Sequence, residues 1–213
     1  MIELLSWNNL SYSFDKTITL SFPDGSIHRG ESLAIIGSSG SGKSTWLQLL
    51  SGILPLQSGE VHFDSHPLHN TSRRERDQLR SKYLGIVFQK NHFLENLTIQ
   101  DNLSLPSYAQ KSAFDTALVN DLCEKLKVFH LLDKKPRDCS VGELQRLSII
   151  RTMSTRPSFI LADEPTSALD DKNAEAILEV FETIQKSMNV GIIIVTHDQR
   201  VKSRVSNVIS FTS

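Results

Sequence analysis

The sequence predicts an α/β fold whose central sheet is mostly parallel, because apolar runs that suit buried strands alternate with helical patterns. The clearest runs are FILA at 159–162 and GIIIV at 191–195. They lack polar residues, as is typical of parallel strands buried on both faces. A long helical pattern at 171–188 lies between them. This order of strand, helix and strand is what indicates a parallel sheet.

The remaining elements follow from the same patterns. Further strands are expected at 33–36, 59–63, 83–88 and, more weakly, 208–211. Further helices are expected at 43–50, about 98–129 and 140–156. Pro106 should break the second of these helices, and Pro157 should end the third. Because residues 90–157 contain so few strand patterns, we expect a helical lobe there. It would be inserted into a single domain, 1–213, whose core is 1–89 and 158–213.

The composition is that of an ordinary globular protein, with 39% hydrophobic and 22% charged residues among 213. This length suffices for one sizeable core with or without a small satellite lobe. The net charge of -1 gives no indication of a nucleic-acid partner. The densest basic run, within 73–82, is interleaved with acids. We interpret it as a solvated helix face, with a nucleic-acid patch as the minor alternative.

The cysteines and the N-terminus exclude some other classes. Neither cysteine belongs to a metal-binding or disulfide pattern, and Cys123 is expected to be a buried thiol. The N-terminal residues lack the charged and apolar regions of a signal peptide. No apolar run approaches the roughly 20 residues that span a bilayer. We therefore expect a soluble protein made in the cytosol, which acts at a membrane only through a partner.

The strongest motif is GSSGSGKST at 37–45, directly after the strand pattern LAII and before the helical pattern WLQLL. It matches the phosphate-binding loop G-x-x-x-x-G-K-[ST] in its usual context. Its glycines let backbone amides converge on phosphate oxygens, and the helix dipole adds to the attraction. Lys43 is expected to reach the β- and γ-phosphates, and Ser44 to offer its hydroxyl to Mg²⁺. The predicted nucleotide-binding residues here are Gly37, Ser38, Ser39, Gly40, Ser41, Gly42, Lys43, Ser44 and Thr45.

Two acids, Asp163 and Glu164, follow the strand pattern 159–162 at its carboxyl end, where the sites of α/β proteins lie. Asp163 is expected to hold Mg²⁺ through water. Glu164 is expected to be the general base for the water that attacks the γ-phosphate. Because Pro165 and Thr166 follow, one of the two carboxylates could instead cap a helix.

A second candidate anion site is CSVGE at 139–143, which runs into a helical pattern. Ser140 and Glu143 have the spacing of a capping box. Gly142 costs about 1 kcal/mol relative to alanine in a first helical turn, so its presence indicates that something approaches the backbone closely. A helix N-terminus carrying a serine also binds anions.

Three further residues complete the pattern: Gln89 ends YLGIVFQ, Asp170 ends SALD, and His197 follows GIIIVT. Together with the phosphate loop, LADEP and CSVGE in this order, they make the chain resemble the nucleotide-binding subunit of an ATP-binding cassette (ABC) transporter. The resemblance covers essentially the whole chain. It implies a P-loop NTPase core, an N-terminal antiparallel β portion and an inserted helical lobe. The catalytic residues that it implies are Lys43, Gln89, Glu164 and His197, and the metal ligands are Ser44, Gln89 and Asp163.

In that family, the position of CSVGE carries a Leu-Ser-Gly-Gly-Gln/Glu signature that grips the γ-phosphate held by a second subunit. The resemblance therefore implies a head-to-tail dimer, expected to be a homodimer, with two ATP molecules at its interface. It also implies Mg²⁺ as cofactor, an integral membrane permease as partner, no nucleic acid, and a cytoplasmic location on the inner face of the cell membrane. The implied contacts to nucleotide outside the phosphate loop are Ser140, Gly142, Glu143, Asp170 and the adenine-stacking aromatic Phe14, with Tyr12 as the alternative.

Two features qualify or refine the resemblance. Cys139 and Val141 depart from the signature, which bears on the efficiency of that site. The segments 88–102 and 161–166 look most like those of ATPases from lipoprotein-release, macrolide-export and cell-division systems. The alternative function is a soluble ABC-type ATPase acting on DNA or ribosomes, although the coiled-coil insertions or tandem cassettes usual there are not visible. A third class is a P-loop kinase. Such an enzyme would need a site for an acceptor substrate and would lack the signature.

Overall fold

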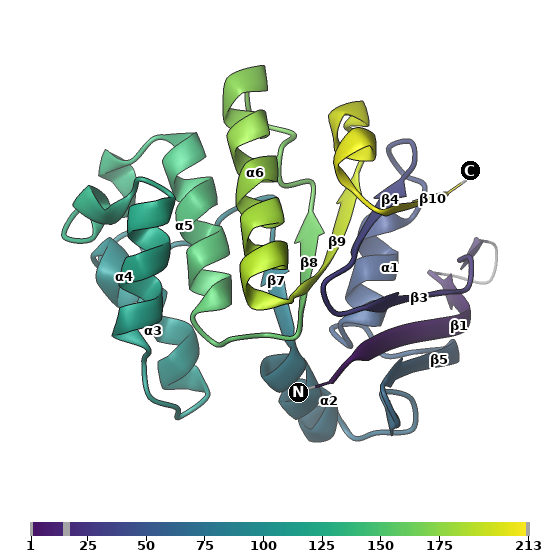
Figure 1. Cartoon of the computed structure of the whole chain (residues 1–213). Coiled ribbons are helices and arrows are strands. Elements are labelled where there is room, and N and C mark those ends of the chain that lie inside the picture. Colours follow the sequence, from purple (N-terminus) through teal and green to yellow (C-terminus); the bar gives the residue numbers. More distant parts are fainter. Residues whose placement is uncertain (1, 15–17, 212–213) are drawn as a thin grey trace.

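The computed structural model describes residues 2–14 and 18–211, which form two sheets flanked by helices (Figure 1). The central sheet is parallel throughout, with strand order β10-β4-β9-β8-β7. Its strands are β4 (Ser32–Ile36), β7 (Leu84–Val87), β8 (Phe159–Asp163), β9 (Gly191–Thr196) and β10 (Asn207–Ser210). The predicted α/β class with a parallel central sheet is confirmed.

The second sheet is antiparallel and is formed by the first third of the chain. Its strands are β1 (Leu4–Ser13), β2 (Thr19–Ser21), β3 (Gly25–His28), β5 (Ser58–Phe63) and β6 (His66–Pro67). The order is β2-β1-β5-β6, and β3 also pairs with β1. The expected N-terminal antiparallel portion is therefore confirmed.

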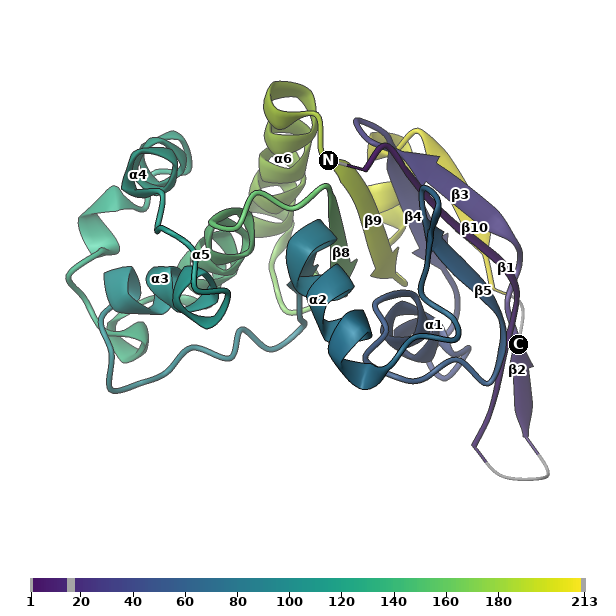
Figure 2. The ribbon, with the colours of Figure 1, turned by 90° about the horizontal axis from the view of Figure 1, so that it is seen from below.

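Helices cover both faces of the parallel sheet. They are α1 (Lys43–Leu50), α2 (Arg73–Tyr83), α3 (Ile99–Ala109), α4 (Thr116–Lys125), α5 (Val141–Met153) and α6 (Asp171–Met188). Helices α3, α4 and α5 lie together on one side of the molecule, and the antiparallel sheet lies on the other (Figures 1 and 2). Short 3-10 segments occupy Phe129–Leu131, Pro136–Asp138 and Gln199–Arg204.

Alternate side chains of the parallel strands supply two cores, because successive residues of a strand point to opposite faces. The core shared with α5 and α6 contains, from β4 and β9, Ala34, Ile36, Ile192 and Ile194. The core shared with α1 and the antiparallel sheet contains, from the same strands, Leu33, Ile35, Ile193 and Val195. Burial on both faces explains why these strands read as uninterrupted apolar runs.

The prediction that Pro106 breaks a helix is wrong. Helix α3 runs through Pro106, and the break falls later, between the end of α3 and Asp115, which caps α4. An internal proline removes one backbone hydrogen bond. Here Leu103 and Ser107 on either side of it are buried, and α3 packs against α5. The packing of α3 in the folded protein therefore offsets the cost of the hydrogen bond lost at Pro106. The local sequence pattern contains only that cost.

Other boundaries shift by a few residues. Tyr83 ends α2 instead of beginning a strand, and α5 ends at Met153, ahead of Pro157. Burial of Cys123 is as predicted and raises the pKa of its thiol to about 12. Among the residues that the structure describes, no helix combines the length and apolarity that crossing a membrane requires.

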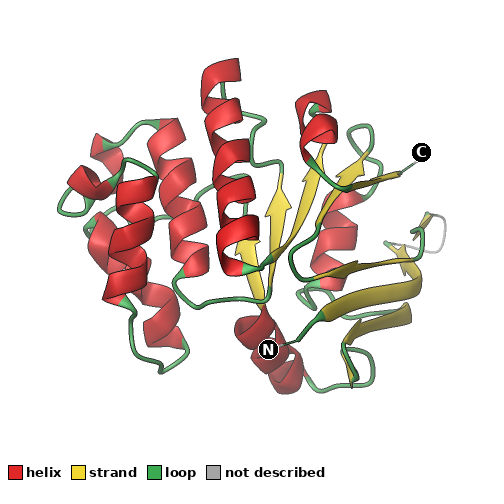
Figure 3. Ribbon diagram, viewed as in Figure 1, coloured by secondary structure: helices red, strands yellow, loops and turns green. Residues whose placement is uncertain are grey.

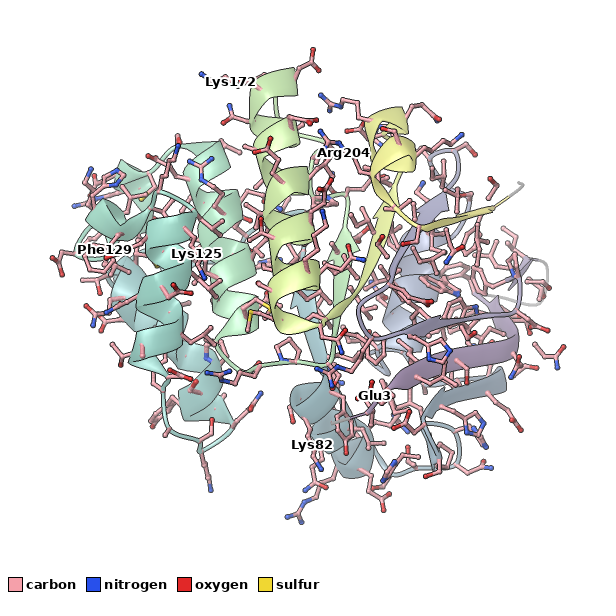
Figure 4. The ribbon with its side chains drawn as sticks, in the orientation of Figure 1. Glu3, Lys82, Lys125, Phe129, Lys172 and Arg204 are labelled. Carbon is pink, nitrogen blue, oxygen red and sulfur yellow. The ribbon has the colours of Figure 1, made fainter. Side chains whose placement is uncertain are left out.

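The basic run forms α2, with Ser72 and Glu75 in a capping box at its start. Arg80 pairs with Asp77 one turn earlier, at 2.6 Å. Lys82 lies exposed at the periphery of the protein (Figure 4), with its Nζ 4.8 Å from the ring centroid of Tyr83. These are the features of a solvated helix face.

Candidate nucleotide-binding site

A cavity of about 670 Å³ opens at the edge of the parallel sheet where its strands end. Figure 3 shows β4, β8 and β9 running toward this common edge. Segments far apart in the chain converge there, because the carboxyl ends of parallel strands lie side by side. The lining residues are Phe14, Leu20, Ser38, Ser39, Gly40, Gly42, Lys43, Ser44, Thr45, Gln89, Glu164 and His197.

The loop between β4 and α1 depends on Gly42, which precedes α1 with a φ of 87°. That left-handed conformation is strained for a residue with a Cβ. Space also requires glycine, since a Cβ here would lie 2.7 Å from Cδ1 of Leu20. Gly37 and Ser41 do not line the cavity. They pack together, and a Cβ at Gly37 would lie 2.5 Å from the Ser41 hydroxyl.

Lys43 begins α1 and is 7% exposed. Its Nζ donates to the carbonyl oxygens of Gly37 and Ser38, both at 2.8 Å, and lies 4.0 Å from Oε1 of Glu164. A buried ammonium group requires such partners. A phosphate entering the loop would offer charged acceptors, which form stronger hydrogen bonds than neutral carbonyls.

Asp163 ends β8, and its Oδ1 accepts a hydrogen bond of 3.2 Å from the hydroxyl of Ser44. Burial raises the pKa of the Asp163 carboxyl, and the charge of Glu164 raises it further, against the lowering effects of Ser44 and Lys43. A divalent cation would offset this buried negative charge. A carboxylate and a hydroxyl are also the oxygen donors that Mg²⁺ prefers, so these two residues fit a Mg²⁺ site.

Glu164 follows β8 with a φ of 48°. A non-glycine residue in this left-handed region costs on the order of 1 kcal/mol and persists only where its surroundings hold it. Its N–H donates to the carbonyl of Val195 at 2.8 Å. Its Oε2 accepts from the Thr196 hydroxyl, and its Oε1 lies near Nδ1 of His197, each at 2.9 Å. The turn thus carries the carboxylate from the strand end into the cavity lining.

Gln89 and His197 are both linked to Glu164, Gln89 through Ser167 to its main-chain carbonyl and His197 directly to its carboxylate. Nε2 of Gln89 donates to the hydroxyl of Ser167 at 3.2 Å, and that hydroxyl donates to the carbonyl of Glu164 at 3.0 Å. The side chain of His197 is 64% exposed. Its ring is therefore accessible to a ligand in the cavity while it contacts Glu164.

Of the two candidate adenine-stacking aromatics, the cavity contains Phe14. Phe14 as a whole residue is 61% exposed. Tyr12 packs edge-on against Phe14, with ring centroids 5.1 Å apart, and against the core between the sheets. Stacking on a base needs an open aromatic face. The geometry favours Phe14.

Four predicted residues lie outside the cavity of their own chain, at the first turns of α5 and α6. Ser140 and Glu143 form the predicted capping box. The Ser140 N–H donates to Oε2 of Glu143 at 2.7 Å, and the Glu143 N–H donates to Oγ of Ser140 at 3.4 Å. Asp170 caps α6 by accepting from the Asn173 N–H at 2.8 Å, which lowers the pKa of its carboxyl.

Gly142, the fourth of these residues, is buried against the start of α6. A Cβ at Gly142 would lie 2.9 Å from Oδ1 of Asn173, whose Nδ2 donates to Asp170 at 2.8 Å. The close approach that this glycine indicated therefore exists within the chain itself. Val141 beside it is 56% exposed, so the outer side of this turn is open to another molecule.

Sequence reasoning missed two residues of this site. Thr196 orients Glu164, and a polar residue at the carboxyl end of a buried strand is a signal that could have identified it. Leu20 lies on the short strand β2 and reaches the cavity only because β2 packs over Gly42. No local sequence pattern indicates that Leu20 belongs to the site.

Comparison with known proteins supplies the family. Residues 20–167 match the ABC transporter family, a range that contains the phosphate loop and both acids after β8. The chain belongs to this family. The lipoprotein-releasing system ATP-binding protein LolD of Francisella tularensis subsp. holarctica is 36% identical over 187 residues, which cover 85% of this chain and 80% of LolD.

Two solved ABC structures share the fold. The ATP-binding cassette MJ0796, in a dimeric post-hydrolysis state bound to ADP and Pi, has a TM-score of 0.83 at 27% identity, covering 98% of this chain and 94% of that one. CbiO1 of Clostridium perfringens, part of the ABC transporter complex CbiONQ, has a TM-score of 0.89 at 30% identity, covering 100% and 86%.

The chain is therefore the ATP-binding subunit of an ABC transporter and an ATPase. The predicted resemblance is confirmed, and it agrees with the expected subgroup in that curated relatives such as LolD are ATP-binding proteins of a lipoprotein-releasing system. The alternative of a soluble ATPase acting on DNA or ribosomes is not favoured.

Proposed function

We propose that the cavity binds Mg-ATP. The observation that carries the proposal is that three groups meet at one edge of the parallel sheet. Lys43 donates to a loop carbonyl, Asp163 accepts from the Ser44 hydroxyl, and Glu164 lines the cavity. Loop amides and Lys43 would bind the phosphates. Ser44 and Asp163, with Gln89, would hold Mg²⁺, which stabilises charge on the transferring phosphoryl group.

Within this site, Glu164 is the general base that accepts a proton from the attacking water. The hydroxyl of Thr196 donates to one carboxylate oxygen, which leaves the other facing His197 and Lys43. The left-handed backbone of Glu164 is the strained feature that places this carboxylate, and strain of this kind collects at functional sites.

We propose that a second copy of the chain completes the site, with Ser140, Gly142, Glu143 and Asp170 acting on its partner's ATP. These residues lie outside their own chain's cavity, at the starts of α5 and α6, where Ser140 and Asp170 cap the N–H groups of Glu143 and Asn173. The N–H groups of a first helical turn have no carbonyl partner within the helix. The positive end of the helix dipole would attract a γ-phosphate. The related cassette MJ0796 is dimeric in its post-hydrolysis state.

An integral membrane permease is the other partner that we propose, and it would hold the protein on the inner face of the cell membrane. The curated relative is named for lipoprotein release, so a permease of that kind is the candidate.

The expected division into a core of 1–89 and 158–213 and a helical lobe of 90–157 remains a proposal.

The dimer can be tested with a variant that binds ATP but does not turn it over. Glu164→Gln with Mg-ATP is expected to double the mass measured by light scattering and to bury more than about 1,000 Å², the lower bound for a specific interface. Without nucleotide it should be a monomer, because the ligand that bridges the two surfaces is missing. Lys43→Ala is the matched control and should remain monomeric at the same ATP concentration. A monomer at saturating Mg-ATP would contradict the dimer.

The adenine contact is tested by comparing two neighbouring aromatics. Phe14→Ala is expected to weaken ATP affinity roughly tenfold, since stacking one base is worth about 1–3 kcal/mol. Tyr12→Ala removes a ring that does not line the cavity, so its ATP affinity should stay within about twofold. Titration with a fluorescent adenine nucleotide measures both. Equal losses in the two variants would exclude a specific role for Phe14.

A further inference from the structure

We propose that Glu60, His62 and His69 form a binding site for a divalent transition-metal cation of the Zn²⁺ class on the antiparallel sheet. Their ligand atoms all lie within 4.8 Å of one another. The antiparallel sheet lies on the side of the molecule opposite α3, α4 and α5 (Figure 2). None of the three residues lines the nucleotide cavity.

Two of the ligands come from alternate positions of β5. Val61 and Phe63 are fully buried in the core between the sheets, whereas Glu60 is exposed and His62 is half-buried. Because side chains alternate along a strand, Glu60 and His62 share the opposite, outer face of the sheet. The pairing of β5 with β1 fixes both backbone positions, with Glu60 opposite Asn8.

The third ligand is brought back by the β5–β6 hairpin. The N–H of Leu68 donates to the carbonyl of Val61 at 2.7 Å, and the Leu68 side chain is buried. The carbonyl of Leu68 accepts a hydrogen bond of 2.6 Å from the hydroxyl of Thr71. His69 is therefore held on a fixed backbone next to β5, with its ring centroid 5.0 Å from that of His62.

The distances are close to those of a coordination sphere. Nε2 of His62 lies 3.1 Å from Oε2 of Glu60, and Nε2 of His69 lies 3.8 Å from Oε1 of the same carboxylate. Ligands at about 2.0–2.2 Å from a tetrahedral metal ion are separated by roughly 3.3–3.6 Å. Small rotations of the exposed Glu60 and of the two rings would therefore close the site without moving the backbone.

The donor set selects the class of cation. Two imidazoles and one carboxylate suit Zn²⁺, Co²⁺ or Ni²⁺, whereas Mg²⁺ and Ca²⁺ prefer oxygen ligands alone. Three protein ligands leave a fourth position for water. Arg76 lines a hollow of about 250 Å³ together with Glu60 and His69, but its guanidinium donates to the carbonyl of Thr71 at 2.7 Å. Among the described residues it forms no ion pair with Glu60, so this carboxylate is available to a cation.

The test is a calorimetric titration of the nucleotide-free protein with Zn²⁺, repeated with Co²⁺. One equivalent should bind to the wild type. His62→Gln and His69→Gln should each weaken binding by about 100-fold or more, since loss of even an outer-shell partner commonly costs 10–100-fold. His66→Gln is the matched control, because His66 lies in the same hairpin but its Nδ1 contacts the carbonyl of Phe63 at 3.2 Å instead of the cluster.

Thermal unfolding supplies a second readout that does not depend on catalysis. A cation at a hundredfold excess over its Kd should raise the melting temperature by on the order of 5 °C in the wild type and in His66→Gln, and not in the two ligand variants. ATP affinity should be unchanged in all four proteins. Zn²⁺ binding that survives in both ligand variants, or no binding to the wild type, would overturn the proposal and leave Glu60 and His62 as a surface ion pair.

Discussion

Glu164→Gln is expected to lower ATP turnover by roughly two orders of magnitude or more while ATP binding survives. Glutamine has nearly the same shape but cannot accept the proton of the attacking water. Its amide can still contact the Thr196 hydroxyl that holds one carboxylate oxygen at 2.9 Å. Binding should persist because, in the proposed site, the phosphates are held by the loop and Lys43, which this substitution leaves in place. Steady-state phosphate release and a nucleotide titration measure the two effects.

Lys43→Ala provides the contrasting control, since it removes the cation that donates to the loop carbonyls, where we propose that the phosphates bind. This variant should lose most of its affinity for ATP, so both nucleotide binding and ATP turnover should fall. Wild-type turnover by Glu164→Gln would show that another group is the base. A parallel loss of binding in Glu164→Gln would show instead that this carboxylate supports the structure of the cavity.

Gly142→Asp is expected to abolish dimer-dependent hydrolysis while ATP still binds to the phosphate loop of the same chain. The added carboxylate would stand at the first turn of α5, where we propose that the partner's γ-phosphate docks. Like charges repel strongly in a partly desolvated interface. Turnover measured against protein concentration, together with a nucleotide titration, separates the loss of assembly from a loss of binding.

The structure makes a further control necessary, because a Cβ at Gly142 would also lie 2.9 Å from Oδ1 of Asn173. Gly142→Ala introduces this contact without a charge, and Gly142→Asp combined with Asn173→Ala keeps the charge but removes the contact. If the charge is decisive, the double variant stays inactive and Gly142→Ala retains most of its turnover. An inactive Gly142→Ala, or a Gly142→Asp protein with normal turnover, would leave Ser140 and Glu143 with their helix-capping role alone.

Local patterns were sufficient for most elements of the fold. The apolar runs at 159–162 and 191–195 became β8 and β9, which pair in parallel with Phe159 opposite Gly191. The spacing of Ser140 and Glu143 correctly predicted a helix start. The break at Pro106 was predicted from the same kind of local rule and failed. Helix α3 continues through Pro106 because it packs on α5, and a rule based on local sequence does not include such packing.

Much of the candidate site could also be predicted, since its residues follow strands of one parallel sheet. Lys43, Gln89, Glu164 and His197 are separated by long stretches of sequence, yet all four line one cavity. Parallel strands end at a common edge, which explains why residues that follow four different strands meet there. Gln89 and His197 were assigned to the site through the resemblance to the ABC family. The proposal of Phe14 over Tyr12 as the adenine contact needed coordinates, because both belong to the same N-terminal segment and, of the two, Phe14 lines the cavity.

By itself, the sequence determined the phosphate loop and the acids after β8, because each is a run of neighbouring residues. It also determined the α/β class and the resemblance to the ABC family, because the order of such runs along the chain is visible without coordinates. Tertiary structure decided the left-handed placement of Glu164 under Thr196, the contact of Gly142 with Asn173, and the gathering of Glu60, His62 and His69. These three features depend on strand pairing and on helix packing. Such contacts join residues of different strands, helices and loops, so only the folded backbone brings them within reach.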